Sequence, residues 1–240
     1  MNNPIGPYPG RQLFLGLTPD NRPCFAYLVT GRSPASRDRI AVPIENGVRI
    51  GPMGGANYDP LRHYSALKYD NPSGLLTVSN GIQTEAIFET YKLIYHTGNQ
   101  PGKDYLEKIL DGAGAEPDPP INTPRIGGIS TQIGDGQPVL IIGIKTFGKA
   151  ARAWQVQPAA GKMTGIATYR GDLEKPEGTA PNSTPPELEL KGNTAQYLAD
   201  YLFDISATLY KGADIRVCAV GGVRNENRSW DVFIKNVMTA

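Results

Sequence analysis

The segment QLFLGLTPDNRPCFAYLVT, residues 12–30, decides the fold class of this chain. It contains two apolar runs, Gln12–Leu17 and Cys24–Thr30, that are candidate strands, and the polar turn Pro19–Arg22 joins them into a hairpin. A second turn signal follows at Asn46-Gly47, a pair that readily adopts the backbone angles of a tight hairpin turn. The chain therefore begins as antiparallel strands, and its 28 glycines and 21 prolines favour a strand-rich protein with many turns.

Further strand candidates continue outward from this hairpin. Each is a short apolar or alternating run bounded by turn residues. These candidates are Arg39–Ile44, Val48–Ile50, His63–Tyr69, Leu75–Val78, Arg125–Ile129, Pro138–Lys145, Ala153–Val156, Gly165–Tyr169, Arg216–Val220 and Trp230–Lys235.

Three segments predict helices, because apolar side chains recur at three- and four-residue spacing. Residues that cap helices or stop them mark the expected ends. The expected helices are Glu85–Tyr95 with Thr84 as its cap, Asp104–Leu110 stopped by Gly112, and a third that follows Asn193 or Thr194, carries Leu198, Leu202, Ile205 and Leu209 on one face and ends at Gly212.

Strands and helices fall in blocks rather than in strict alternation, which predicts an α+β fold with largely antiparallel sheets. No internal repeat or linker divides the chain, so we expect a single domain over residues 1–240. The Pro-rich segment Gly171–Pro186 offers little that can pack and is expected to be a mobile surface loop.

Composition excludes several classes of function. The net charge of +1 argues against binding to nucleic acid or to a membrane surface. Neither a signal peptide nor a membrane-spanning run is expected, and Cys24 and Cys218 are expected to be buried reduced thiols, so a cytoplasmic location fits. With two histidines and no glycine-rich nucleotide fingerprint, no metal site and no cofactor are predicted. A homo-oligomer is left open.

The first candidate motif is the loop that carries Arg32, Ser33 and Arg37. Two guanidinium groups and nearby hydroxyls are suited to holding a phosphate, because arginine donates paired hydrogen bonds to oxyanions. A solvated basic loop explains the same residues equally simply.

Two further motifs begin at Ser79 and Asn122. Asn80-Gly81 stands between a strand and a helix, where backbone N–H groups are free, but a turn with a helix cap is the simpler interpretation. In Asn122-Thr123-Pro124-Arg125, the proline forces Thr123 toward an extended conformation, and Asn122 and Arg125 are candidate ligands of a base edge and a developing oxyanion. The structural alternative is the start of a strand with one exposed arginine.

These motifs resemble, in order, those of the archaeal-type IMP cyclohydrolases. The opening from Pro9-Gly10-Arg11 to Pro43 is similar to the family's opening, including its Gly-Arg start. The matching stretches within and after it are Pro23-Cys24-Phe25-Ala26-Tyr27, Gly31-Arg32-Ser33, Val78-Ser79-Asn80-Gly81 followed by Thr84, Asn122-Thr123-Pro124-Arg125-Ile126, and Thr168-Tyr169.

The resemblance implies the four-layer αββα sandwich of N-terminal-nucleophile hydrolases and ring closure of 5-formamidoimidazole-4-carboxamide ribonucleotide to IMP. The purine nucleotide would be the partner that binds. The implied catalytic residues are Tyr64, Asn122, Arg125 and Glu116, with Asp118 as an alternative to Glu116. The implied substrate-binding residues are Arg32, Ser33, Arg37, Asn80, Gly81, Thr123 and Tyr169.

Three alternatives remain open from the sequence. The chain could be an amide hydrolase of the N-terminal-nucleophile type, which would expose a new Thr, Ser or Cys terminus. It could be a nucleotide-binding or RNA-binding module without catalysis, although the near-zero net charge disfavours RNA. It could also be a relative that acts on another substrate.

Overall fold

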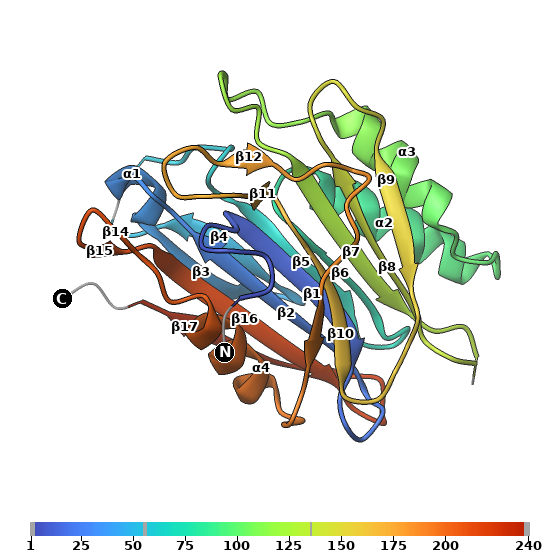
Figure 1. The fold of residues 1–240 in the computed structure, drawn as a ribbon. Coiled ribbons are helices and arrows are strands. Elements are labelled where there is room, and N and C mark those ends of the chain that lie inside the picture. Colours follow the sequence, from blue (N-terminus) through green and yellow to red (C-terminus); the bar gives the residue numbers. More distant parts are fainter. Residues whose placement is uncertain (1–2, 55–56, 135, 238–240) are drawn as a thin grey trace.

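The computed structural model describes residues 3–54, 57–134 and 136–237, and two large antiparallel sheets dominate it (Figure 1). The six-stranded sheet has the order β13 (Glu187–Glu189), β10 (Lys162–Ala167), β1 (Arg11–Leu17), β2 (Pro23–Thr30), β16 (Arg216–Arg224) and β17 (Trp230–Asn236). The seven-stranded sheet has the order β3 (Arg39–Ile44), β4 (Gly47–Pro52), β5 (Tyr64–Asp70), β6 (Leu75–Ser79), β7 (Arg125–Thr131), β8 (Val139–Lys145) and β9 (Arg152–Val156).

Short elements complete the described part of the chain. The helices are α1 (Pro34–Arg37), α2 (Gln83–His96), α3 (Lys103–Ala113) and α4 (Ala195–Ile205). Two small ribbons pair β11 (Tyr169–Arg170) with β12 (Glu177–Gly178) and β14 (Leu209–Tyr210) with β15 (Ala213–Asp214). Few helices accompany many antiparallel strands, so the expected α+β class is confirmed.

The two sheets pack face to face over the largest apolar core. In β1, Leu13 and Leu15 point into this core, whereas Phe14 points to the opposite face of the sheet. Neighbouring side chains of a strand point to opposite faces, so both faces of β1 are buried. β2 is likewise buried at every position, which explains why the two strands of segment 12–30 are apolar at nearly every position rather than at every second one.

Helices cover the outer faces of both sheets. Leu198 and Leu202 of α4 pack against the six-stranded sheet, and Ile87 of α2 and Leu106 of α3 pack against the seven-stranded sheet. Across the molecule the order is therefore α4, the six-stranded sheet, the seven-stranded sheet, and then α2 with α3 (Figure 1).

Several expected helix ends were wrong. Thr84 does not cap α2, because its hydroxyl lies 2.5 Å from the carbonyl oxygen of Ser65 and Ile82 occupies the cap position without a side-chain bond. Gly112 lies inside α3, which ends at Ala113 and is followed by the cap residue Gly114 with a φ of 67°. Thr194 caps α4 as one of the two expected candidates, since its hydroxyl accepts from the amide of Tyr197 at 3.1 Å.

The C-terminal end of α4 also differs from expectation. The helix stops at Ile205, and the hydroxyl of Ser206 donates to the carbonyl of Leu202 at 2.7 Å. Leu209 is 68% exposed in β14, and Gly212 belongs to the turn between β14 and β15. The expected helix included Leu209 and ended at Gly212, because Leu209 happens to continue the apolar spacing of the helix.

One expectation around residue 170 was also wrong. Tyr169 does not continue β10, because the chain leaves the sheet at Thr168, whose hydroxyl donates to the carbonyl of Pro9 at 3.1 Å. The Pro-rich segment after it lies largely at the surface, as expected, and makes backbone contacts: β12 pairs with β11, and Thr146 donates to the carbonyl of Thr179 at 2.6 Å. Both cysteines are fully buried and free, as expected.

The close contact between α4 and β16 at Gly221 predicts that a side chain at this position lowers the stability of the protein. A Cβ atom at Gly221 would lie 2.2 Å from the carbonyl oxygen of Ala195 and 2.6 Å from the amide nitrogen of Ala199. Gly221→Ala should therefore push the helix off the sheet and lower the free energy of unfolding by about 3 kcal/mol. Urea denaturation measures this, with Gly51→Ala as the control because no atom lies within 4 Å of its added Cβ. Equal midpoints for the two variants would contradict the packing described here.

Candidate active site

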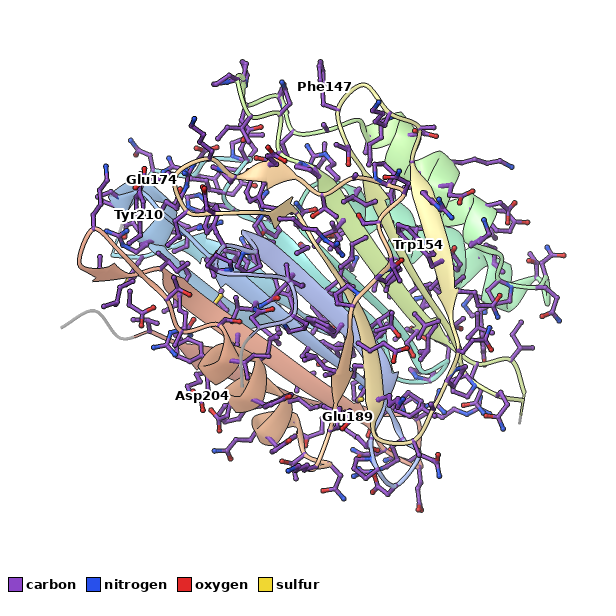
Figure 2. The ribbon with its side chains drawn as sticks, viewed as in Figure 1. Phe147, Trp154, Glu174, Glu189, Asp204 and Tyr210 are labelled. Carbon is purple, nitrogen blue, oxygen red and sulfur yellow. The ribbon has the colours of Figure 1, made fainter. Side chains whose placement is uncertain are left out.

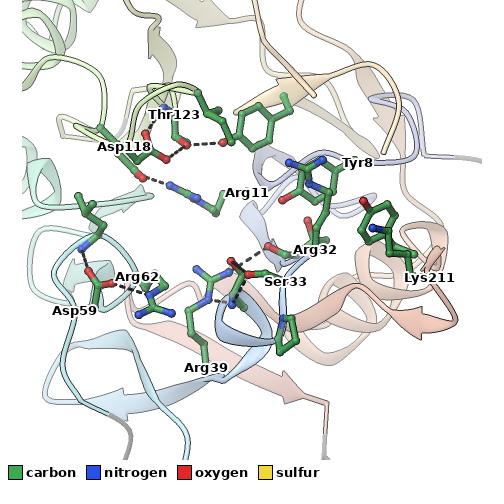
Figure 3. Close-up of a pocket in the computed structure, with 18 residues that line it drawn as sticks. Tyr8, Arg11, Arg32, Ser33, Arg39, Asp59, Arg62, Asp118, Thr123 and Lys211 are labelled. Atoms are coloured by element: carbon green, nitrogen blue, oxygen red, sulfur yellow. Dashed lines mark hydrogen bonds and ion pairs between the residues drawn. The ribbon is translucent and has the colours of Figure 1, made fainter. Parts of the chain in front are cut away.

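A cavity of about 700 Å³ opens at one edge of the two sheets (Figure 3). This volume is in the range of small-molecule binding sites. Antiparallel pairing brings the start of β1, the end of β2 and the starts of β3 and β7 to this edge. The residues that line it are Tyr8, Arg11, Thr30, Arg32, Ser33, Pro34, Ser36, Arg39, Asp59, Leu61, Arg62, Glu116, Asp118, Ile121, Thr123, Tyr169, Tyr210 and Lys211.

A buried charge cluster forms the floor of the cavity. Arg11, the first residue of β1, makes an ion pair with Glu116, which lies in the loop between α3 and β7. Nη1 of Arg125 lies 3.9 Å from the same carboxylate. All three side chains are buried, and two guanidinium groups face one carboxylate. The floor therefore carries a net positive charge in a region with little water.

The pKa directions of this cluster follow from burial and pairing. Burial raises the pKa of Glu116, and the positive charges of Arg11 and Arg125 oppose that rise. Burial lowers the pKa of Arg125, opposed by Glu116. Burial alone would lower the pKa of Arg11, but Glu116 and Tyr64 outweigh it, so that pKa is raised and Arg11 stays charged.

Asn80 fixes the position of this cluster from the protein side. Its Nδ2 donates to Glu116 at 3.2 Å and to the carbonyl of Pro124 at 2.9 Å, while its Oδ1 accepts from the amide of Ile126 at 2.7 Å. The neighbouring Gln83 donates to Asn80 Oδ1 at 3.0 Å and accepts from Arg125 at 3.1 Å. The Asn80 amide is therefore fully engaged by the protein and holds Glu116 rather than lining the cavity.

A chain of hydroxyl groups lies beside the floor. The carboxylate of Asp118 accepts from the backbone amide and the hydroxyl of Thr123, both at 2.6 Å. The same hydroxyl oxygen is hydrogen-bonded to the phenol of Tyr169. Burial raises the pKa of Tyr169 to about 12, so its phenol is protonated at neutral pH.

Two arginines on the opposite wall have no carboxylate partner among the described residues. Arg39 donates to the carbonyls of Ser36 at 2.7 Å and Thr30 at 3.2 Å. Arg32 donates to the carbonyl of Leu173 at 2.5 Å, and its guanidinium lies 5.1 Å from the ring centre of Tyr8. Backbone carbonyls thus fix the direction of both side chains without neutralising their charge, which is the arrangement expected of an anion site.

Figure 3 shows the resulting division of the cavity. Asp118 and Thr123 lie on one side, Ser33 and Arg39 on the other, and Arg11 lies between them. Arg62 is already paired with Asp59 at 2.7 Å. The rim is closed by the ribbon that carries Tyr210, whose hydroxyl donates to Glu174 at 3.1 Å; both are labelled side by side in Figure 2.

The structure brings together six of the residues expected from the sequence at the cavity wall. These are Arg32, Ser33, Glu116, its alternative Asp118, Thr123 and Tyr169. Ser33 also caps α1, because its hydroxyl accepts from the amide of Ser36 at 3.1 Å.

The other expected site residues lie beneath or beside the wall. Arg125 and Asn80 support Glu116 from below, and a Cβ at Gly81 would lie 2.2 Å from Nη1 of Arg125, so glycine makes room for that guanidinium. Arg37 donates to the carbonyl of Arg32 at 2.7 Å rather than lining the cavity. Asn122 has a φ of 48° and lines a separate hollow beside Phe147.

Tyr64 lies directly under the cavity. Its phenol oxygen is 2.8 Å from that of Tyr27, and the side chain is buried. Burial raises the pKa of Tyr64, while the positive charges of Arg11 and Arg39 oppose the rise. Tyr64 therefore does not line the cavity, although it lies close enough to Arg11 and Arg39 for their charges to influence it.

Sequence reasoning missed several cavity residues, above all Arg39 and Arg62, and it treated Arg11 only as part of the Gly-Arg start. Single arginines at strand ends carry no recognisable pattern. Arg11 and Arg39 each begin a strand, and this shared position is a signal only once strand order is known. Arg62 lies in a turn that precedes β5.

No group of potential metal ligands occurs among the described residues, and none of the helices they form is long and apolar enough to cross a membrane. A protein-family model described as IMP cyclohydrolase-like protein matches residues 8–228, a span that contains every residue at the cavity wall. No curated protein matches the chain.

The floor cluster predicts a large effect of neutralising its carboxylate. Glu116→Gln leaves Arg11 and Arg125 buried without an ion-pair partner and should lower the free energy of unfolding by about 3 kcal/mol. The control is Glu85→Gln, which removes an exposed partner of Lys68 and should cost less than about 0.5 kcal/mol. Urea denaturation measures the free energy of unfolding of both variants. A similar small decrease in both would show that the ion pairs of Glu116 do not stabilise the folded protein.

Proposed function

This chain belongs to the IMP cyclohydrolase-like protein family, and we propose that it closes the ring of 5-formamidoimidazole-4-carboxamide ribonucleotide to give IMP and water. Family membership confirms the resemblance of the sequence motifs. The single observation that supports this reaction best is the division of the cavity between an anion site without carboxylates and a buried floor that holds one carboxylate between two guanidinium groups.

The reaction joins two groups of the same molecule. The carboxamide nitrogen attacks the formyl carbon, a C–N bond forms, and the formyl oxygen leaves as water. That water carries one hydrogen from the carboxamide nitrogen and one from the formamido nitrogen. Because both reacting groups are already tethered, holding them in the reactive orientation removes much of the barrier.

The floor of the cavity meets the two electrostatic needs of this step. A neutral amide is a weak nucleophile, so its N–H requires an acceptor, and Glu116 is the carboxylate at the floor. The formyl oxygen gains negative charge during attack, and Arg11 presents a cation beside Glu116. Contacts with Arg125, Asn80 and Gln83 keep this pair in place. The buried phenol of Tyr64 contributes to the raised pKa of Arg11.

The phosphate of the substrate belongs at the opposite wall. Arg32 and Arg39 are held by backbone carbonyls and keep their charge unpaired, and Ser33 and Ser36 add hydroxyl groups beside them. Arg37 supports this wall through the carbonyl of Arg32. Asn122 reaches the substrate in this proposal only if its loop turns inward on binding.

The layer order is also part of the proposal. Two antiparallel sheets with helices on both outer faces support a relationship to the fold of N-terminal-nucleophile hydrolases. The proposed activity uses no terminal nucleophile, because ring closure needs no covalent intermediate.

Turnover gives the direct test of this function. The purified protein, in the presence of a chelator, should convert the formamido nucleotide to IMP faster than the uncatalysed reaction. Glu116→Gln should reduce kcat at least about 100-fold with a smaller change in KM, because it removes the proton acceptor. The assay is run at a temperature where thermal melting shows that the variant is folded. No turnover by the wild-type protein, even with tight IMP binding, would contradict the enzyme proposal and favour a binding protein.

The phosphate assignment has a separate test. Arg39→Gln should raise KM about tenfold or more with little change in kcat, since charged hydrogen bonds to a phosphate contribute to ground-state binding. Arg49→Gln, an exposed position on β4, is the control and should leave KM unchanged. With the nucleoside that lacks the phosphate, Arg39→Gln and the wild-type protein should perform alike. An equal defect with both substrates would remove Arg39 from the phosphate site.

A further inference from the structure

The hydrogen-bond chain from Asp118 through Thr123 to Tyr169 has a fixed direction. A carboxylate can only accept, so the hydroxyl of Thr123 donates its single proton to Oδ2 of Asp118 at 2.6 Å. The bond between the hydroxyl of Thr123 and the phenol of Tyr169 must then use the phenol proton. Tyr169 is therefore a donor to Thr123 and has only lone pairs left for other partners.

The carboxylate end of the chain is held by a second bond. Oδ1 of Asp118 accepts from the backbone amide of Thr123 at 2.6 Å, which orients Oδ2 toward the hydroxyl. A charged acceptor binds a hydroxyl proton more strongly than a neutral phenol does. The reverse direction, with Thr123 donating to Tyr169, would leave the carboxylate without that bond.

Packing also fixes the ring of Tyr169. The ring stacks on Tyr8 with centroids 5.5 Å apart and planes 13° apart. On another side, a Cβ at Gly10 would lie 2.5 Å from the ring, so the backbone there is in close contact with it. The ring cannot turn to present a different edge, and Thr123 is the only hydrogen-bond partner of its phenol among the described residues.

We propose that Tyr169 is a specificity-determining residue that presents a fixed hydrogen-bond acceptor to the base end of the ligand, so that the cavity selects nucleotides with an N–H donor there. That donor is the carboxamide N–H of the open substrate and the ring N1–H of a 6-oxopurine product. A nucleotide with a bare ring nitrogen at this position places two lone pairs against each other. This inference rests on the proposed function.

The position of Tyr169 in the cavity supports the base end rather than the phosphate end. Figure 3 shows Thr123 and Asp118 on one wall and Arg39 and Ser33 on the other. Tyr169 is hydrogen-bonded to Thr123, and the backbone amide of Glu116 donates to the carbonyl of Thr123 at 2.8 Å. The described residues of the cavity wall include three acidic side chains. Asp59 is paired with Arg62, which leaves Asp118 and Glu116 on the side of Tyr169. The hydrogen-bond acceptors of the cavity therefore lie on the wall where the N–H group of a base would bind.

The test compares two ligands that share ribose and phosphate. IMP carries the N1–H donor, and purine ribonucleoside 5′-phosphate carries a bare N1. Calorimetry should show that the wild-type protein prefers IMP. Tyr169→Phe should lower the affinity for IMP about fivefold to tenfold. The affinity for purine ribonucleoside 5′-phosphate should change less than twofold, because only IMP loses a hydrogen bond.

A second variant frees the phenol proton of Tyr169. Thr123→Val removes the acceptor that holds this proton but leaves the Tyr169 phenol and its lone pairs in place. The freed phenol can donate as well as accept, so the affinity for purine ribonucleoside 5′-phosphate should rise severalfold while that for IMP changes little. Thr123→Ser keeps the hydroxyl and should behave as the wild-type protein, and thermal melting confirms folding of each variant. If Thr123 had a purely structural role, Thr123→Val would lower the affinity for both nucleotides by a similar factor.

Each outcome has a defined meaning. A smaller preference for IMP in Thr123→Val, caused by tighter binding of purine ribonucleoside 5′-phosphate, supports the inference. Equal weakening of both nucleotides in Tyr169→Phe would overturn it, because the phenol would then contact the shared ribose or phosphate. Unchanged affinities in both variants would overturn it as well. If the wild-type protein binds neither nucleotide, the proposed function fails first, and this inference falls with it.

Discussion

The buried ion pair between Arg11 and Glu116 is the interaction on which the rest of the site depends. Arg11 begins β1 in the six-stranded sheet, and Glu116 belongs to the segment that leads into β7 of the seven-stranded sheet. The pair therefore joins the two sheets at the edge where the cavity opens. Breaking such a pair in a buried region is costly because it leaves an uncompensated charge. The net positive charge left by Arg125 makes the same place attractive to an incoming oxyanion.

Strand positions could be predicted well from the sequence because burial on both faces leaves continuous apolar runs bounded by turn residues. Segment 12–30 and the Asn46-Gly47 turn gave strands within one or two residues of β1 to β4. Helix ends were predicted less well. The hydroxyl of Thr84 bonds to another strand instead of capping its helix, and Leu209 continues an apolar period that the chain does not use. Both errors arise from tertiary contacts that no local pattern contains.

The candidate site was predicted in part for a similar reason. Of the residues expected from the motifs, Arg32, Glu116, Thr123 and Tyr169 line one cavity, because the loops that carry them lead into or out of strands whose ends meet at one edge. Sequence could not say which way a side chain points. Asn80 was expected to bind substrate, but its side-chain amide is hydrogen-bonded to Glu116 and to backbone groups. Arg39 belongs to no motif and yet lines the cavity.

Glu116 has to satisfy two opposing requirements in the proposed reaction. A proton acceptor must be basic enough to hold the carboxamide N–H, and pairing with Arg11 and Arg125 alone would make this carboxylate a weak base. Burial works in the other direction and raises the pKa of Glu116 above its usual value. A substrate that enters would remove water from the cavity, which would strengthen both effects together. In the proposed reaction Arg11 would shift its hydrogen bonding toward the formyl oxygen as that oxygen gains charge, so Glu116 would become more basic when the amide proton must leave. The shared pair would thus couple stabilisation of the oxyanion to removal of the proton, which a lone carboxylate at the same place could not do.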